Sequence, residues 1–142
     1  MKNSIKGLIM YIELIKNSDG VEKKSLKKSI RRCFQYYSES LPRLISQKAY
    51  DYNKSHNNLD LQNIDAFNRK RGELVLEHTT PIMTFIDYLI SLPKDKLEEE
   101  ILNYSGCCWI IKDEDKELTK LGFRTKRNNW KESYKSAGIV LI

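Results

Sequence analysis

The chain has 142 residues, of which 40% are hydrophobic and 31% are charged, and its net charge is +6 at pH 7. These proportions are typical of a globular protein and exclude a disordered or fibrous chain. The length predicts a single domain, with a basic helical part at residues 1–54 and a mixed α/β part at 59–142. No apolar run is long enough to span a bilayer, so we expect no membrane contact and a cytoplasmic location.

The amino-terminal segment is predicted to form an amphipathic helix. Its apolar residues recur three or four positions apart, at Ile5, Leu8, Ile9, Ile12 and Ile15. Glu13 interrupts the apolar stretch and no small-residue cleavage site follows, which argues against a secretion signal. The Asn-Ser-Asp-Gly sequence at 17–20 has turn chemistry and is expected to end the helix.

The next segment repeats a four-residue pattern three times over residues 23–34: two basic residues, one small residue and one apolar residue. On a helix, residues four apart differ by only about 40° in direction, so equivalent residues form ridges. Leu26, Ile30 and Phe34 should therefore face the core. The basic residues should cover about half of the helix circumference; they are Lys23, Lys24, Lys27, Lys28, Arg31 and Arg32.

This basic face has two interpretations. Like charges three or four residues apart destabilise a helix slightly, and phosphates would offset that repulsion while releasing counterions. Alternatively, the face is merely solvated and keeps the protein soluble. Residues 1–58 have twelve Lys or Arg against five Asp or Glu, whereas residues 59–142 have thirteen against fourteen. Because the positive charge is concentrated around the repeat, we favour binding of a polyanion.

The middle of the chain is expected to be helical and then extended. Pro42 starts a new helix or kinks the previous one, and an apolar stripe at 44–52 continues it. The polar sequence at 53–58 is predicted to be a loop. A short helix is indicated by the apolar residues at 61–67, followed by a strand at 73–77.

The rest of the chain is predicted to combine helices with short strands. Thr80 and Pro81 favour the start of a helix. Four helices are expected here, at 81–92, 94–103, 113–121 and 130–137. A strand at 107–111 and a final strand from the apolar tail at 139–142 complete the pattern. The sequence therefore predicts a predominantly helical α+β fold, with the amino-terminal helices packed on a small sheet of short strands and further helices.

The three cysteines are expected to be free thiols. An odd number with two adjacent members does not suggest a disulfide framework, and no Cys-x-x-Cys pair is present for a zinc site. We expect Cys33, and one of Cys107 and Cys108, to pack as small apolar groups.

His78 has the strongest catalytic signal of the two histidines. His56 lies in the polar loop, whereas His78 lies between a predicted strand and a capped helix, whose free N–H groups suit a phosphate. The sequence from Glu77 to Pro81 is similar to the first motif of HNH nucleases over these few residues. No His follows His78 and the helix begins at once, so we do not assign the chain to that family.

Two mechanisms of phosphodiester hydrolysis would use this junction. With a divalent metal ion such as Mg²⁺, Glu77 and another carboxylate would hold the ion while His78 acts as general base on water. Without a metal, His78 or Glu77 would activate a ribose 2′-hydroxyl and Arg124 would stabilise the charged transition state. A third interpretation is structural: His78 forms hydrogen bonds within the junction and has no catalytic role.

The sequence thus predicts a basic nucleic-acid-binding protein, DNA or RNA, with the activity of a small nuclease as a further hypothesis. Lys126 and Arg127, in a second basic cluster, would extend the binding surface if the fold places them beside the basic helix. The alternative is a non-catalytic interaction module, an inhibitor or accessory factor, that binds an acidic protein or a protein–nucleic acid complex. By helical angle Tyr37 faces the core and Tyr36 points away from it, and an exposed ring suits bases and protein interfaces equally.

Overall fold

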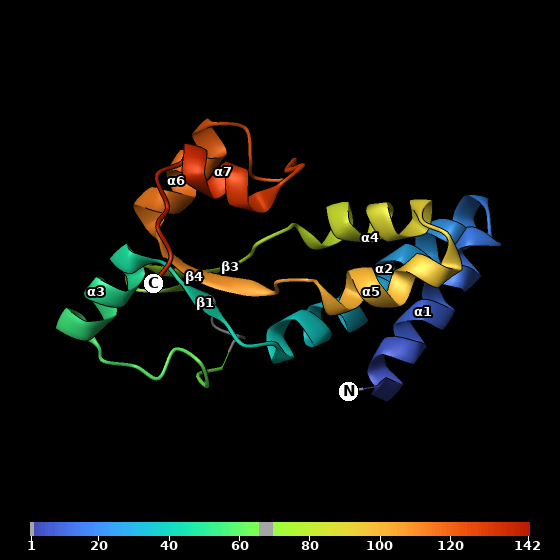
Figure 1. Cartoon of the computed structure of the whole chain (residues 1–142), viewed down its shortest axis with the longest axis horizontal. Coiled ribbons are helices and arrows are strands. Elements are labelled where there is room, and N and C mark those ends of the chain that lie inside the picture. The colour runs from blue at the N-terminus through green and yellow to red at the C-terminus, as the bar shows by residue number, and fades with distance from the viewer. Residues whose placement is uncertain (1, 66–69) are drawn as a thin grey trace. The chain divides into compact units, whose positions relative to one another are not determined.

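The computed structural model describes residues 2–65 and 70–142 (Figure 1). Within them the chain forms seven helices and four short strands, so the predicted predominantly helical α+β fold is confirmed. Contacts group the chain into two compact units: Met1–Ser40 with Ile82–Ser105, here called the helical unit, and Leu41–Pro81 with Gly106–Ile142, the α/β unit. The boundary expected near residues 54–59 lies inside the α/β unit.

The helical unit contains α1 (Lys2–Lys16), α2 (Gly20–Ser40), α4 (Ile82–Ser91) and α5 (Lys94–Leu102). In this unit α1 packs against the other three helices and α2 packs against α4 (Figure 1). Its buried core includes Ile5, Leu8, Ile12, Ile15, Ile30, Phe34, Ile86, Leu89, Leu97 and Ile101. The periodic apolar stripes predicted for the first two helices therefore face inward, and their partners in the unit are α4 and α5.

The four-residue repeat forms α2, as its spacing predicts. Its apolar ridge faces the core, because Ile30 and Phe34 are fully buried. The Phe34 ring packs against three other aromatic rings at centroid distances between 5.1 and 5.6 Å, namely Tyr37, Phe85 and Tyr104. This contact anchors α2 by one side only, which leaves the opposite side of the helix facing away from the core.

The α/β unit is built on a four-stranded sheet with the order β1-β4-β3-β2. The strands are β1 (Leu44–Ile45), β2 (Lys70–Arg71), β3 (Leu74–His78) and β4 (Cys107–Ile111). β4 pairs antiparallel with β3 and parallel with β1, while β2 pairs antiparallel with β3. The helices of this unit are α3 (Gln47–His56), α6 (Lys112–Lys120) and α7 (Trp130–Ser136).

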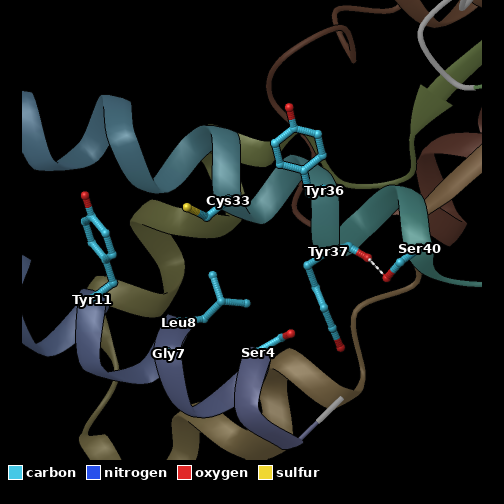
Figure 2. Close-up of a pocket in the computed structure, with 8 residues that line it drawn as sticks. All are labelled: Ser4, Gly7, Leu8, Tyr11, Cys33, Tyr36, Tyr37 and Ser40. Atoms are coloured by element: carbon cyan, nitrogen blue, oxygen red, sulfur yellow. Dashed lines mark hydrogen bonds between the residues drawn. The ribbon is translucent and has the colours of Figure 1, made fainter.

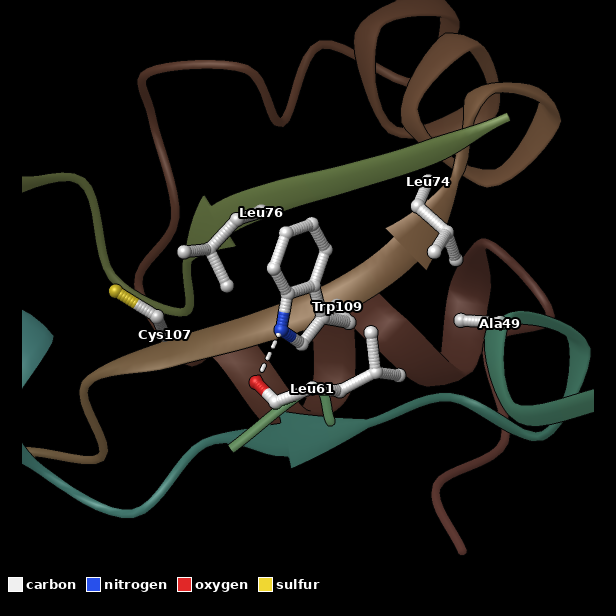
Figure 3. Packing of buried hydrophobic residues seen from close by; sticks show 6 residues of the cluster. All are labelled: Ala49, Leu61, Leu74, Leu76, Cys107 and Trp109. Carbon is white, nitrogen blue, oxygen red and sulfur yellow. Dashed lines mark hydrogen bonds between the residues drawn. The ribbon is translucent and has the colours of Figure 1, made fainter. Parts of the chain in front are cut away.

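Alternate residues of the central strands pack on opposite faces of the sheet. On one face Trp109 packs with Leu74 and Leu76 against Ala49 of α3 (Figure 3). The Trp109 indole N–H donates to the Leu61 carbonyl oxygen over 2.8 Å. On the other face the buried cluster consists of Val75, Cys108, Ile110, Leu118, Tyr134 and Ile139. The sheet therefore lies between α3 and the pair of helices α6 and α7.

Leu44 and Ile45 form a strand, so the helix predicted to start near Pro42 is wrong at these positions. Their backbone pairs with that of β4. α3 begins only after Ser46, whose hydroxyl accepts a hydrogen bond from the Ala49 N–H over 3.1 Å. The apolar residues at 44–52 therefore do not form one helical stripe, because Leu44 and Ile45 belong to β1 and the later ones belong to α3.

Other predicted bounds shift by a few residues. α3 continues to His56, so most of the loop expected at 53–58 is helical. Residues 61–64 form turns and a bend, and Phe67, which completed the predicted short helix, lies outside the described residues. Within the described chain, the apolar tail at 139–142 does not form the predicted final strand. It pairs through one isolated bridge, between Leu141 and Ser46.

Candidate nucleic-acid interface

The basic face of α2 consists of the six Lys and Arg residues of the repeat. Four are exposed to solvent: Lys24, Lys28, Arg31 and Arg32. Lys23 and Lys27 are half-buried, because their helical positions lie beside the apolar ridge. The face thus lies where the sequence predicts it.

Ion pairs cover only a small part of this face. Lys27 Nζ lies 2.7 Å from Asp87 Oδ1 of α4, and both side chains are partly exposed, so the pair contributes little to stability. For the other five basic residues, the described residues supply no ion-pair partner. Apart from Lys27, the basic residues of this face are therefore not paired with carboxylates among the described residues.

Two hollows lie beside the basic face of α2. The larger, about 490 Å³, lies between the two helices (Figure 2); its lining residues are Ser4, Gly7, Leu8, Tyr11, Cys33, Tyr36, Tyr37 and Ser40. The second, about 400 Å³, is lined by Lys28, Ser29, Arg32, Cys33 and Tyr36. Cys33 and Tyr36 line both, so the two hollows adjoin.

Gly7 of α1 is one of the residues that line the larger hollow. A Cβ atom placed on Gly7 would have no heavy atom within 4 Å, so the space beside it is unfilled. Cys33 is exposed next to this space, and the expectation that it packs in the core is therefore wrong. Figure 2 shows Cys33 on α2 and Leu8 on α1 facing the gap between the helices.

Arg127, predicted to bind nucleic acid, is buried in the α/β unit with 6% of its surface exposed. Its guanidinium makes a bidentate ion pair with Glu77 of β3, at 3.1 and 2.7 Å. It also donates to three backbone carbonyl oxygens, those of Phe123, His78 and Thr79. These contacts bind the segment before α7 to the end of β3, and they leave Arg127 unable to reach a phosphate outside.

Glu77, predicted to be catalytic, is the centre of the same buried cluster. Besides the Arg127 pair, one carboxylate oxygen accepts a hydrogen bond from the Tyr134 hydroxyl of α7. Burial raises the pKa of the Glu77 carboxyl, and the Arg127 and Tyr134 contacts offset part of that rise by stabilising the carboxylate. Burial, together with the charge of Glu77, also raises the pKa of the Tyr134 hydroxyl.

The Glu77 cluster is poorly suited to bind a metal ion. Both carboxylate oxygens already accept bonds from the Arg127 guanidinium, whose positive charge would repel a cation. Among the residues that the structure describes, no group of three or more His, Cys, Asp or Glu could hold a metal ion. We therefore do not assign Glu77 as the ligand of Mg²⁺ that the sequence suggested.

His78 ends β3 and is half-buried. Its Nδ1 lies 3.3 Å from the sulfur of Cys107, the residue opposite in β4. The next residue, Thr79, donates both its N–H and its hydroxyl to the Gly106 carbonyl oxygen. The His78 side chain thus belongs to a hydrogen-bonded strand end, the arrangement that the structural interpretation expects.

Arg124 and Lys126, the other predicted site residues of this part, are exposed in the segment between α6 and α7. Neither makes a hydrogen bond or ion pair with any described residue. The structure thus brings Glu77, His78 and Arg127 together. It places Arg124 and Lys126 at the surface, where neither forms a hydrogen bond with those three residues. The charges of Arg124 and Lys126 therefore stay available to solvent.

Sequence reasoning did not identify the hollows beside Tyr36. The signal that could have indicated the larger one is Gly7, an exposed glycine inside a helix, where glycine is otherwise unfavourable. It also did not identify the Glu77–Arg127 pair, whose members are 50 residues apart. No short-range pattern connects those two positions.

No protein-family model, curated protein or solved structure matches the chain. Across the described residues, no helix combines the length and the apolar character needed to cross a membrane. The geometry of the two units is therefore the basis for assigning a function.

Proposed function

We propose that the protein binds nucleic acid through the basic face of α2. The observation that carries the proposal is that five of its six basic residues lack a carboxylate partner among the described residues. Repulsion between like charges at helical spacing makes such a face costly on its own. A phosphate backbone would remove that repulsion and release condensed counterions.

The dimensions of the face favour short, non-specific contacts. From Lys24 to Arg32 the helix rises by about 12 Å, enough for about three or four phosphates of one strand. Exposed Lys and Arg side chains bind phosphates without reading sequence. We therefore expect dissociation constants of about 10⁻⁴ to 10⁻⁶ M at physiological salt and a strong dependence on ionic strength.

The test is fluorescence anisotropy with labelled oligonucleotides at several salt concentrations. Lys24→Gln/Lys28→Gln should weaken binding and reduce the slope of log K against log salt by about 1.4 to 1.8, because two phosphate contacts are lost. The matched control is Lys94→Gln/Lys96→Gln, which removes the same charge from exposed positions of α5. Equal losses in both variants would contradict the proposal, because binding would then depend on net charge and not on α2.

The alternative function, an interaction module for an acidic protein, is favoured by one observation. The helical unit also exposes large apolar side chains, since 73% of Met10, 52% of Leu14 and 87% of Val21 are accessible, and exposed apolar surface is typical of protein interfaces. Binding to a poly-glutamate peptide with an affinity equal to that for an oligonucleotide of the same charge would support this alternative.

Hydrolysis of a bound nucleic acid by His78 stays a separate prediction. Binding by α2 needs only exposed charge in the helical unit, whereas cleavage would need His78 of the α/β unit as general base. The two activities can therefore be measured independently, by anisotropy and by product analysis.

A further inference from the structure

We infer that the strand bound by α2 is single-stranded, with one unpaired base stacked on the Tyr36 ring beside the hollows that Tyr36 and Cys33 share. This inference rests on the proposed function, because it specifies the kind of nucleic acid that the basic face binds. It adds a base-binding position to the basic face of α2.

Tyr36 is an exposed ring without a structural partner. Tyr36 is 69% exposed. Among the described residues, its side chain has no partner for a ring contact, a hydrogen bond or an ion pair. Its neighbour Tyr37 is the opposite, since it is buried against Phe34 and donates its hydroxyl to the Ile101 carbonyl oxygen over 3.1 Å. The Tyr36 ring therefore has no evident role in stabilising the helical unit.

Tyr36 continues a ridge of the basic face. Lys28, Arg32 and Tyr36 are four residues apart in α2, so their side chains follow one another along one side of the helix. They also line the same hollow of about 400 Å³. A strand whose phosphates contact Lys28 and Arg32 would thus have its next base within reach of the Tyr36 ring.

The hollows suit an aromatic base in size and in charge. Both fall in the size range of about 300–1,000 Å³ that is typical of small-molecule sites, and neither lining contains Asp or Glu. A hollow of about 320 Å³ on α5 of the same unit is lined by Asp95, Glu98, Glu99, Leu102 and Asn103. Those carboxylates would repel phosphates, so within this unit charge favours the Tyr36 side.

Base pairing determines whether a base face is accessible to the Tyr36 ring, and this favours a single strand over a duplex. In a duplex the bases are stacked on one another, and a protein ring reaches a base face only if the base is extruded at an energetic cost. In a single strand the base faces are free, and proteins that bind such strands combine a positively charged track with exposed aromatic rings. The ridge from Lys28 to Tyr36 has both features.

The first experiment compares oligo(dT) with a duplex of equal length, using anisotropy at fixed salt. Tyr36→Ala should weaken oligo(dT) binding about tenfold, because it removes one stacked base, and it should leave duplex binding and the salt slope unchanged. Tyr36→Phe should bind like the wild type, since it keeps the ring. The matched control is Tyr50→Ala, which removes an exposed tyrosine from α3 of the α/β unit.

The second measurement uses Cys33, the exposed cysteine beside the hollows, as a probe. Cys107 and Cys108 are fully buried, so a maleimide should modify Cys33 first in the folded protein. Bound oligo(dT) should slow this modification, whereas a duplex held by α2 at equal occupancy should slow it less. Circular dichroism of Tyr36→Ala is expected to match the wild type, because the ring lies outside the core.

The outcomes separate the inference from the proposed function. If neither oligo(dT) nor the duplex binds, the proposed function fails. If both bind equally and Tyr36→Ala has no effect, α2 binds nucleic acid but the stacking inference is overturned. If Tyr36→Ala loses affinity for a poly-glutamate peptide and not for oligo(dT), the ring belongs to a protein interface and the inference is again overturned.

Discussion

The basic face of α2 and the buried arginine of the α/β unit show two opposite uses of positive charge. In α2, Lys24, Lys28 and Arg32 are exposed and lack carboxylate partners among the described residues. Arg127, in contrast, is buried and bonded to the Glu77 carboxylate and to backbone carbonyl oxygens. The first group is available to an external anion, whereas the second already has an internal one.

This difference teaches that clustering of basic residues in a sequence does not by itself indicate a binding surface. The α2 residues repeat at helical spacing next to an apolar ridge, so one face must be basic if the other is buried. Arg127 lies in an irregular segment, where nothing in the local sequence determines the direction of its side chain. The burial of its guanidinium needs a full set of acceptors, which are supplied by Glu77, by the carbonyl oxygens at the end of β3 and by that of Phe123.

The largest expected effect comes from removing the buried arginine. Arg127→Ala should lower the free energy of unfolding by about 3–5 kcal/mol, because it leaves the Glu77 carboxylate buried without its partner. Urea denaturation followed by circular dichroism measures this loss. Lys126→Ala, one position away and exposed, should change the same free energy by less than about 0.5 kcal/mol.

A different result for Arg127→Ala would remove the contrast between the two regions. If this variant kept the stability of the wild type and bound oligonucleotides more weakly, Arg127 would act at the surface as the sequence first suggested. A loss of both stability and binding is not expected at temperatures where the variant stays folded, because the proposed contacts belong to α2.

A smaller effect is expected from the ionisation of Glu77. Burial raises the pKa of its carboxyl above the ordinary value of 4.5, so the folded chain holds this proton more tightly than the unfolded chain. That contribution to stability is fully present below the unfolded pKa and is lost as the pH rises through the folded pKa. Relative to Glu77→Gln, the wild type should therefore lose free energy of unfolding as the pH rises above the ordinary carboxyl pKa.

Urea titrations of both proteins across this pH range measure the difference. A wild type that instead gained stability relative to Glu77→Gln as the pH rises would show that the Arg127 ion pair outweighs burial. The Glu77 pKa would then lie below its ordinary value, and the cluster would act as a buried ion pair of the usual kind.

Much of the fold could be predicted because short-range patterns determine it. The strand at 107–111 has the predicted bounds, and α5 differs from its predicted bounds by one residue, since Pro93 and Gly106 flank these two elements. The exposure of Tyr36 followed from its helical angle and is confirmed. In each case, the residues that determine the element's bounds or the side chain's exposure lie within a few positions in the sequence.

What could not be predicted depends on partners distant in the sequence. Leu44 and Ile45 are extended because they pair with Cys108 and Trp109 of β4, and tertiary pairing of this kind overrides local helix propensity. The direction of Arg127 likewise depends on Glu77, 50 positions earlier. At the candidate interface, the larger hollow lies between α1 and α2, and no pattern within either helix specifies how closely the two helices approach.

The smallest expected effect concerns His78. His78→Ala should cost about 1 kcal/mol in stability, the typical value of one hydrogen bond, and should leave anisotropy with oligonucleotides unchanged because His78 does not belong to the helical unit. Incubation with single- and double-stranded DNA and RNA, with and without Mg²⁺, measures cleavage in the same samples. Products that form with the wild type and not with His78→Ala would assign His78 as a general base. Their absence from the wild type in all eight mixtures would remove the nuclease hypothesis and leave binding by α2 as the activity to explain.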